Sequence, residues 1–243
     1  RCSYRSASKA LVSAFVERWQ PETNTFHMPF GEMTITLDDV SAILSIPVSG
    51  RSLSSPTLST DRDAVSLLHR ALGVSNAVAR DELSRVHGHS VRLQWLRDTF
   101  RAVTDAAGLP SVQFAARAYL LYVLGCTLFT DKSGTRVSIQ YLDPLLQLDR
   151  IHTYAWGAAG LAHLYRQLGL ATRRDVKQIA GYLTLLETWI YEHFRLFRPT
   201  PDLTYTIDLP LARRWTTRRE SGSAAEVLQA VREQLDVLGI EEV

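Results

Sequence analysis

Cysteine, methionine and lysine are all scarce in this chain. Its 243 residues include 2 cysteines, 2 methionines and three lysines, which are Lys9, Lys132 and Lys177. Cys2 lies beside the first residue and Cys126 lies within an apolar run, which argues against a disulfide framework and favours a reducing compartment. Arginine therefore supplies nearly all the positive charge, a preference that we attribute to lineage bias.

Strong net charge and long apolar runs are also missing. The 27 basic and 25 acidic residues give a formal net charge of +2, so bulk charge does not point to nucleic acid or a membrane. The longest apolar run, residues 118–129, is interrupted and shorter than the ~20 residues that span a bilayer. No secretory signal is visible, and we expect no membrane partner. Because the first residue is Arg1, we expect a fragment of a longer protein.

The strongest local signals lie in residues 15–50. Leu11, Phe15 and Trp19 recur at every fourth position, which predicts a helix that Pro21 ends at about residue 20. A small β-hairpin is expected near residues 25–36.

A helix start is predicted directly after this hairpin. Met33, Ile35 and Leu37 would share one face of an extended stretch. Thr36 followed by Asp39 matches a capping box, which predicts a helix beginning at Leu37. Asp38 and Asp39 would then lie in its first turn, where the helix dipole favours negative charge.

The remaining sequence predicts one helix after another. The expected helices span residues 61–72, 75–86, 90–103, 111–128, 154–170, 174–194 and 223–238, with Ser75, Ser90 and Ser223 as caps and residues 108–110 as a stop. A short strand is expected at residues 136–139, and flexible loops at 51–60 and 199–208. We therefore predict an all-α (mainly α) fold in which the small β-hairpin is a minor element. It would be a single domain of residues 1–243 with about eight to ten helices.

Four sequence blocks are informative together. They read FVERWQPETNTFHMPFGEMTITLDDVSAILSIPVSG at 15–50, YLLYVLGCTLFTDKSGTRVSIQYL at 119–142, DRIHTYAWGAAGLAHLYRQL at 149–168 and KQIAGYLTLLETWIYEHF at 177–194. These blocks resemble the plant mobile domain, a family found in plant transposons and in nuclear proteins derived from them. The first block holds the signature residues Trp19, Glu22, Thr23, Phe26, His27, Glu32, Asp38 and Asp39. The resemblance covers residues 10–200, whereas residues 200–243 fit only loosely.

The resemblance implies a nuclear, non-enzymatic interaction module. Its expected partners are proteins in nuclear complexes for transcription regulation, transposon and gene silencing and meristem maintenance, with a phosphatase-like protein among them. Two family descriptions suggest an aminotransferase or a phosphatase. A pyridoxal enzyme needs a well-placed lysine, but Lys9 is near a terminus, Lys132 lies in a polar turn and Lys177 begins a helix. The metal-binding motifs of metallophosphatases are absent from the sequence, so we expect no catalytic residues, cofactor or metal.

One basic cluster is the candidate contact for nucleic acid, the alternative partner. The run RRWTTRR places Arg213, Arg214, Arg218 and Arg219 around Trp215. Arginine binds phosphate and an indole can stack on a base. The competing interpretation, which we favour, has Trp215 turned inward and the arginines paired with acidic side chains.

Overall fold

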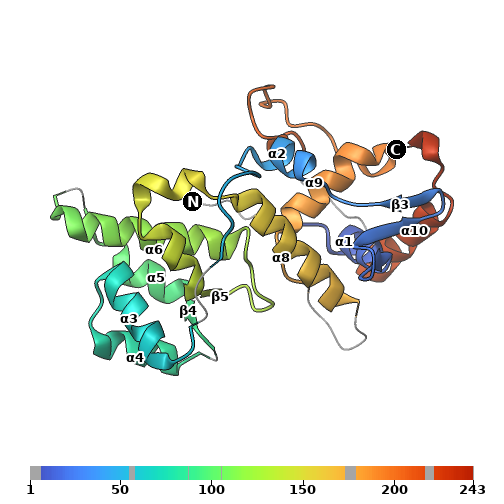
Figure 1. Cartoon of the computed structure of the whole chain (residues 1–243). Coiled ribbons are helices and arrows are strands. Elements are labelled where there is room, and N and C mark those ends of the chain that lie inside the picture. Colours follow the sequence, from blue (N-terminus) through green and yellow to red (C-terminus); the bar gives the residue numbers. More distant parts are fainter. Residues whose placement is uncertain are drawn as a thin grey trace. The chain divides into compact units, whose positions relative to one another are not determined.

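The computed structural model describes residues 7–54, 58–86, 88–104, 106–172, 179–216 and 222–242. The fold is mainly α-helical, as predicted, with one three-stranded and one two-stranded sheet among these residues (Figure 1). The chain divides into two compact units, unit 1 (residues 1–48 and 160–243) and unit 2 (residues 49–159), each with its own hydrophobic core. The boundary falls inside helix α8 (Trp156–Ala171). The expectation that residues 1–243 form one domain stays a prediction.

Unit 1 begins with helix α1 (Lys9–Val16), which is shorter than predicted. The chain leaves the helix before Trp19, which lies in strand β1 (Trp19–Gln20) and pairs with Phe26 of β2 (Thr25–Met28). Their rings meet edge to face with centroids 4.8 Å apart, a cross-strand contact of the kind that stabilises sheets. The prediction that Trp19 lies in the first helix is therefore wrong, because Trp19 belongs to a strand. With β3 (Gly31–Met33), the expected hairpin becomes a three-stranded meander.

The predicted capping box is confirmed at helix α2 (Leu37–Leu44). The Thr36 hydroxyl accepts the backbone N–H of Asp39, and the Asp39 carboxylate accepts the backbone N–H of Thr36. The prediction that Leu37 shares one face of an extended stretch with Ile35 is wrong, since Ile35 is buried and Leu37 is not. Leu37 is 43% exposed because the helix begins there and the strand-like alternation ends.

Helix α9 (Leu183–His193) runs through the core of unit 1, as predicted, but it is shorter than expected. Residues 173–178 lie outside the described part, and Gly181 adopts a positive φ of 95° that interrupts a helix. A Cβ at Gly181 would approach Leu164 Cδ1 to 2.9 Å, so the backbone also lies close to α8 there.

The rest of unit 1 follows α9 in the chain. Two short 3-10 turns come first, η3 (Arg195–Phe197) and η4 (Leu211–Arg213). Ser223 then caps helix α10 (Ala224–Asp236) through a capping box with Glu226, as predicted for Ser223. The 3-10 turn η5 (Ile240–Glu242) ends the described chain.

An aromatic cluster organises the core of unit 1. Phe15 contacts Phe26, Trp189, Phe194 and Phe197 edge on, with centroid distances between 5.1 and 6.5 Å. All five side chains are fully buried. The cluster joins α1, the small sheet, α9 and the η3 turn that follows it.

Unit 2 is a helical bundle with a short two-stranded sheet. Its elements are α3 (Asp61–Leu72), α4 (Asn76–Ser84), β4 (Ser90–Arg92), α5 (Leu93–Phe100), α6 (Leu109–Cys126), β5 (Arg136–Ser138), η1 (Ile139–Tyr141), α7 (Leu142–Leu145) and η2 (Leu148–Thr153). The range of α3, the Ser75 cap of α4 and the strand near residue 136 agree with prediction.

Two predicted helix signals in unit 2 are wrong. Ser90 does not cap a helix, because its backbone pairs with Ser138 between β4 and β5 and α5 begins only at Leu93. Gly108 opens helix α6 and does not end a preceding one, since Pro110 is tolerated in a first helical turn. None of the helices in the described ranges is both long enough and apolar enough for a membrane span.

Candidate functional site

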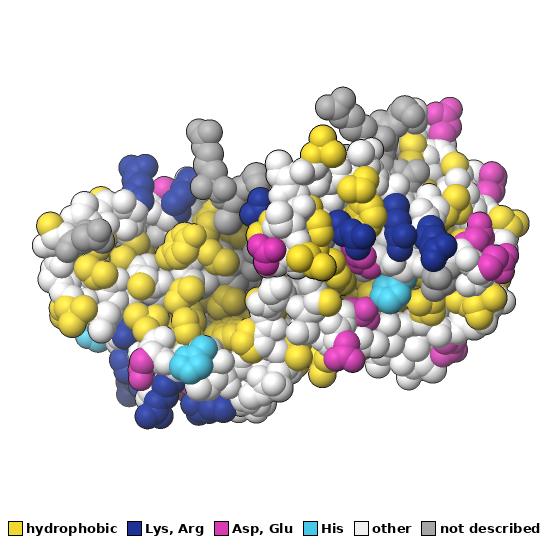
Figure 2. All heavy atoms as spheres, turned by 90° about the horizontal axis from the view of Figure 1, so that it is seen from above, with side chains coloured by type: hydrophobic (Ala, Val, Ile, Leu, Met, Phe, Trp, Pro, Cys, Tyr) yellow, Lys and Arg dark blue, Asp and Glu magenta, His cyan; other side chains and the backbone are white. Residues whose placement is uncertain are grey.

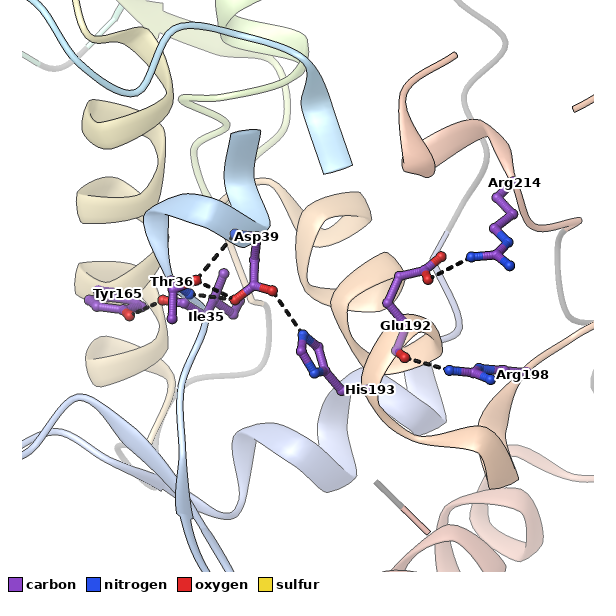
Figure 3. Close-up of polar contacts among 8 residues, drawn as sticks. All are labelled: Ile35, Thr36, Asp39, Tyr165, Glu192, His193, Arg198 and Arg214. Carbon is purple, nitrogen blue, oxygen red and sulfur yellow. Dashed lines mark hydrogen bonds and ion pairs between the residues drawn. The ribbon is translucent and has the colours of Figure 1, made fainter. Parts of the chain in front are cut away.

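Two sets of polar contacts lie at the carboxyl end of helix α9 in unit 1 (Figure 3). The neighbouring residues Glu192 and His193 point to different partners. His193 faces the start of α2, and Glu192 faces the segment around residue 214. We call these residues and their neighbours the α9-end cluster, which consists of Ile35, Thr36, Asp39, Tyr165, Glu192, His193, Arg198, Arg214 and Trp215.

The Asp39–His193 pair joins the two helices. His193 Nε2 lies 2.8 Å from Asp39 Oδ1, at the carboxyl end of α9 and in the first turn of α2. The helix dipole favours the negative charge of Asp39 in the first turn of α2 and a positive charge on His193 in the last turn of α9. Burial is the largest single influence on the pKa of Asp39 and raises it. The hydrogen bonds from His193 and from the Thr36 N–H and hydroxyl, with the charge of His193, together outweigh burial and lower this pKa below its usual value.

Tyr165 holds α8 against the segment between β3 and α2. Its hydroxyl lies 2.5 Å from the carbonyl oxygen of Ile35, to which it donates, and 2.7 Å from the Thr34 hydroxyl. Burial raises the pKa of Tyr165, the hydrogen bond with Thr34 opposes this, and the charge of Asp39 adds to the rise. Tyr165 is thus held in its neutral, hydrogen-donating form.

Glu192 is the acceptor for the other half of the cluster. Its carboxylate accepts the indole N–H of Trp215 at 2.6 Å and a guanidinium N–H of Arg214 at 3.0 Å. Arg198 donates to the carbonyl oxygens of Tyr191 and Glu192, at 2.6 and 2.5 Å. It thereby satisfies carbonyl groups that the end of a helix leaves open.

The structure places the basic cluster in two different settings. Trp215 is 7% exposed, so its inward orientation, the interpretation we favoured, is confirmed. Arg214 pairs with Glu192, whereas Arg213 is exposed. Arg218 and Arg219 lie outside the described residues. Nucleic-acid contact by Arg213, Arg214, Arg218 and Arg219 stays a prediction. The indole of Trp215 is too buried to stack on a base.

The signature residues fall into a buried and an exposed group. Trp19 and Phe26 lie in the core, and Asp39 belongs to the α9-end cluster. The remaining signature residues are exposed: Glu22, Thr23, His27, Glu32 and Asp38.

Hydrogen bonds and strand pairing link several of these exposed residues. The hydroxyl groups of Thr23 and Thr25 lie 2.7 Å apart, and Thr25 donates to Glu32 at 3.0 Å. His27 and Glu32 are partners across β2 and β3.

Sequence reasoning missed the partners that lie far away in the chain. Glu192, His193 and Tyr165 carried no local motif, and they meet Trp215, Asp39 and Ile35 only through the fold. A second missed group is the buried Glu187, which accepts the backbone N–H of Ser8 at 2.7 Å and the Tyr191 hydroxyl at 2.9 Å. The signal in the sequence was its place among the apolar residues Leu185, Leu186, Trp189 and Ile190 of α9.

Comparison with known proteins identifies the family. The family model of the plant mobile domain matches residues 2–243. The chain is 40% identical to Protein MAINTENANCE OF MERISTEMS of Arabidopsis thaliana over 233 residues, which is 96% of this chain and 46% of that protein. It is 40% identical to Protein MAIN-LIKE 1 of the same species over 234 residues, 96% of this chain and 44% of that protein.

A third relative in Arabidopsis thaliana is the Serine/threonine-protein phosphatase 7 long form homolog, 38% identical over 190 residues, or 78% of this chain and 14% of that protein. No solved structure matches the chain. The chain spans less than half the length of the curated relatives it matches. On the match of the family model and of these relatives, the chain belongs to the plant mobile domain family.

Proposed function

We propose that this domain is a non-enzymatic nuclear module that docks protein partners. Family membership supports a role in transcription regulation, transposon silencing and meristem maintenance, and one relative is named for meristem maintenance. A phosphatase-like protein is a candidate partner. The relative named as a phosphatase homolog is matched over only 14% of its length, so that name is not carried over to this chain.

The observation that carries the proposal is that the carboxylates of the α9-end cluster bind other parts of the same chain. Asp39 accepts hydrogen bonds from Thr36 and His193, and Glu192 accepts them from Trp215 and Arg214. A general base must have a lone pair within reach of a substrate proton. Here Asp39 joins α2 to α9, and Glu192 joins α9 to the segment at residues 210–216. This structural use of the two carboxylates supports a scaffold that presents a surface to a partner.

Affinity purification from plant nuclei, followed by mass spectrometry, tests the proposal. The 243-residue chain should retain a reproducible set of proteins, and Trp19→Ala, which removes a buried core ring and destabilises the fold, should retain less of that set. A chain that retains no protein above the background of an unrelated helical domain would overturn the proposal. So would a visible absorbance band of bound pyridoxal phosphate that disappears in Lys132→Ala or Lys177→Ala.

Nucleic-acid binding is the second candidate function. The observation that favours it is the exposure of Arg195, Arg198 and Arg213 around one end of α9. A mobility shift on mixed DNA and RNA should then weaken steeply with salt, and Arg213→Glu should flatten that dependence, as expected for phosphate contacts. Binding that Arg213→Glu leaves unchanged at every salt concentration would remove Arg213 from the site.

A further inference from the structure

The segment between α9 and α10 contains an ordered loop at residues 199–216, which we call the 199–216 loop. Its two ends pair with each other: Asp202 N–H donates to Arg214 O at 2.7 Å, and Thr216 N–H donates to Thr200 O at 3.1 Å. Pro201 and Trp215 form an antiparallel bridge there. Since Trp215 is buried and bonded to Glu192, the base of the loop is fixed to the end of α9.

The tip of the loop is also held by its own hydrogen bonds. Tyr205 N–H donates to Asp202 O and Leu209 N–H donates to Thr206 O, both at 3.0 Å, which gives two successive turns. The Asp202 carboxylate accepts the N–H and the hydroxyl of Thr204 at 2.9 and 2.7 Å. The turns therefore present their side chains in a defined arrangement.

Two aliphatic side chains on these turns extend into solvent. Leu203 is 99% exposed and Ile207 is 94% exposed, and Leu196 on the adjoining η3 turn is also exposed. A single exposed aliphatic residue on a surface needs no explanation. Leu203 and Ile207 on successive turns of an ordered loop, with Leu196 on the adjoining η3 turn, offer exposed apolar area to a partner.

The base of this loop is positively charged. Arg195, Arg198 and Arg213 are exposed there, while the carboxylate of Glu192 is already engaged by Arg214 and Trp215. On the part of the molecule formed by unit 1, Figure 2 shows Lys and Arg side chains gathered beside hydrophobic ones. A complementary surface would thus place apolar groups against the tip and carboxylates against the base.

The chemistry of the loop favours a protein over a lipid surface or a nucleic acid. Asp202 and Asp208 adjoin the two exposed aliphatic residues in the chain, and these carboxylates would be repelled by anionic lipid headgroups. Bases bind by stacking on rings, but the indole of Trp215 is buried and Tyr205, the ring at the tip of the loop, is half-buried. Leu203 and Ile207 offer no ring.

We propose that the 199–216 loop is the docking element of this domain. Leu203 and Ile207 enter an apolar groove on a partner protein, and carboxylates at the rim of that groove meet Arg195 and Arg213. This inference rests on the proposed function, for which it names the surface and the chemistry of the partner. The Glu192–Trp215 contact then serves to hold the docking loop in place.

The first experiment labels the loop in the full 243-residue chain. A photoreactive phenylalanine derivative replaces Leu203, and in a control chain it replaces Leu109, an aliphatic residue of unit 2 that is 70% exposed. After irradiation in plant nuclear extract, we expect a discrete protein adduct from position 203 that position 109 does not give. An adduct that nuclease digestion or lipid extraction removes would overturn the proposal in favour of nucleic acid or membrane.

The second experiment measures the affinity of the purified adduct protein for matched variants. Leu203→Asp with Ile207→Asp should weaken binding about tenfold or more, as for central interface residues, while Leu109→Asp should bind as wild type. Arg195→Glu with Arg213→Glu should also weaken binding, by a factor that shrinks as salt is added. Circular dichroism checks that each variant is folded.

The outcomes separate the loop from the function as a whole. If the double aspartate variant is folded and binds with wild-type affinity, the loop is not the docking element, although the module retains a partner. If affinity purification retains no protein, the proposed function itself fails. A chain that retains partners but gives no adduct at position 203 counts against the loop alone.

Discussion

At the scale of single residues, the same side chain types serve different purposes according to their distant partners. Trp19 and Trp189 are buried with indole N–H groups that have no hydrogen-bond partner among the described residues, whereas the indole of Trp215 donates to Glu192. The first two tryptophans therefore contribute through ring contacts alone, and the third also fixes a loop. Substitution should distinguish these two roles.

Replacing Trp19 with alanine should lower the free energy of unfolding by about 3–5 kcal/mol, the range for a large buried aromatic. Its ring contacts Phe26 and Tyr165 with centroid distances of 4.8 and 5.1 Å. Trp19→Phe should cost clearly less, because it keeps a ring and loses an N–H that has no partner among the described residues. Urea unfolding at neutral pH measures both changes. Equal stability of wild type and Trp19→Ala would show that Trp19 does not hold the sheet in the core.

The Asp39–His193 pair should make stability depend on acid pH. Because the pKa of Asp39 is lower in the folded chain than its ordinary value of 3.8, the unfolded chain takes up the proton first. The stabilisation is therefore complete above about pH 5 and is lost as the pH falls through the folded pKa. Asp39→Asn removes the charge, so its unfolding free energy should lie furthest below wild type near neutrality. The two should converge in acid, and a gap of constant size across urea titrations from neutral to acid pH would contradict this assignment.

At the scale of elements, local signals predicted three helix starts at which a short-range hydrogen bond defines the boundary. The caps at Thr36, Ser75 and Ser223 lie within three residues of their partners, and the sequence shows them. Boundaries set by distant pairing could not be found in this way, because Trp19 and Ser90 join strands only through Phe26 and Ser138. The same limit applies to the site, because the contacts of Glu192 with Trp215 and of His193 with Asp39 join residues 23 and 154 positions apart in the chain.

The capping box of α2 should be measurable by itself. Thr36→Ala removes the hydroxyl that accepts the Asp39 N–H at 3.2 Å and should cost about 0.5–2 kcal/mol of unfolding free energy. Thr36→Ser keeps that hydroxyl and is the matched control, with a much smaller expected loss. Because α2 faces α9, the alanine change should also weaken the Asp39–His193 pair, which the acid dependence described above reports. A loss of equal size in both variants would show that the hydroxyl is not the cap.

At the scale of the whole molecule, the two units should unfold together. The boundary between residues 159 and 160 falls inside α8, so melting either unit removes part of a helix on which the other depends. Leu68→Ala in unit 2 and Leu186→Ala in unit 1 each empty a fully buried position, at a cost of about 2–5 kcal/mol. Both should lower the midpoint of one common thermal transition, with calorimetric and van't Hoff enthalpies in agreement. A second transition that responds to only one of the two substitutions would establish two independently folding domains in place of the predicted single one.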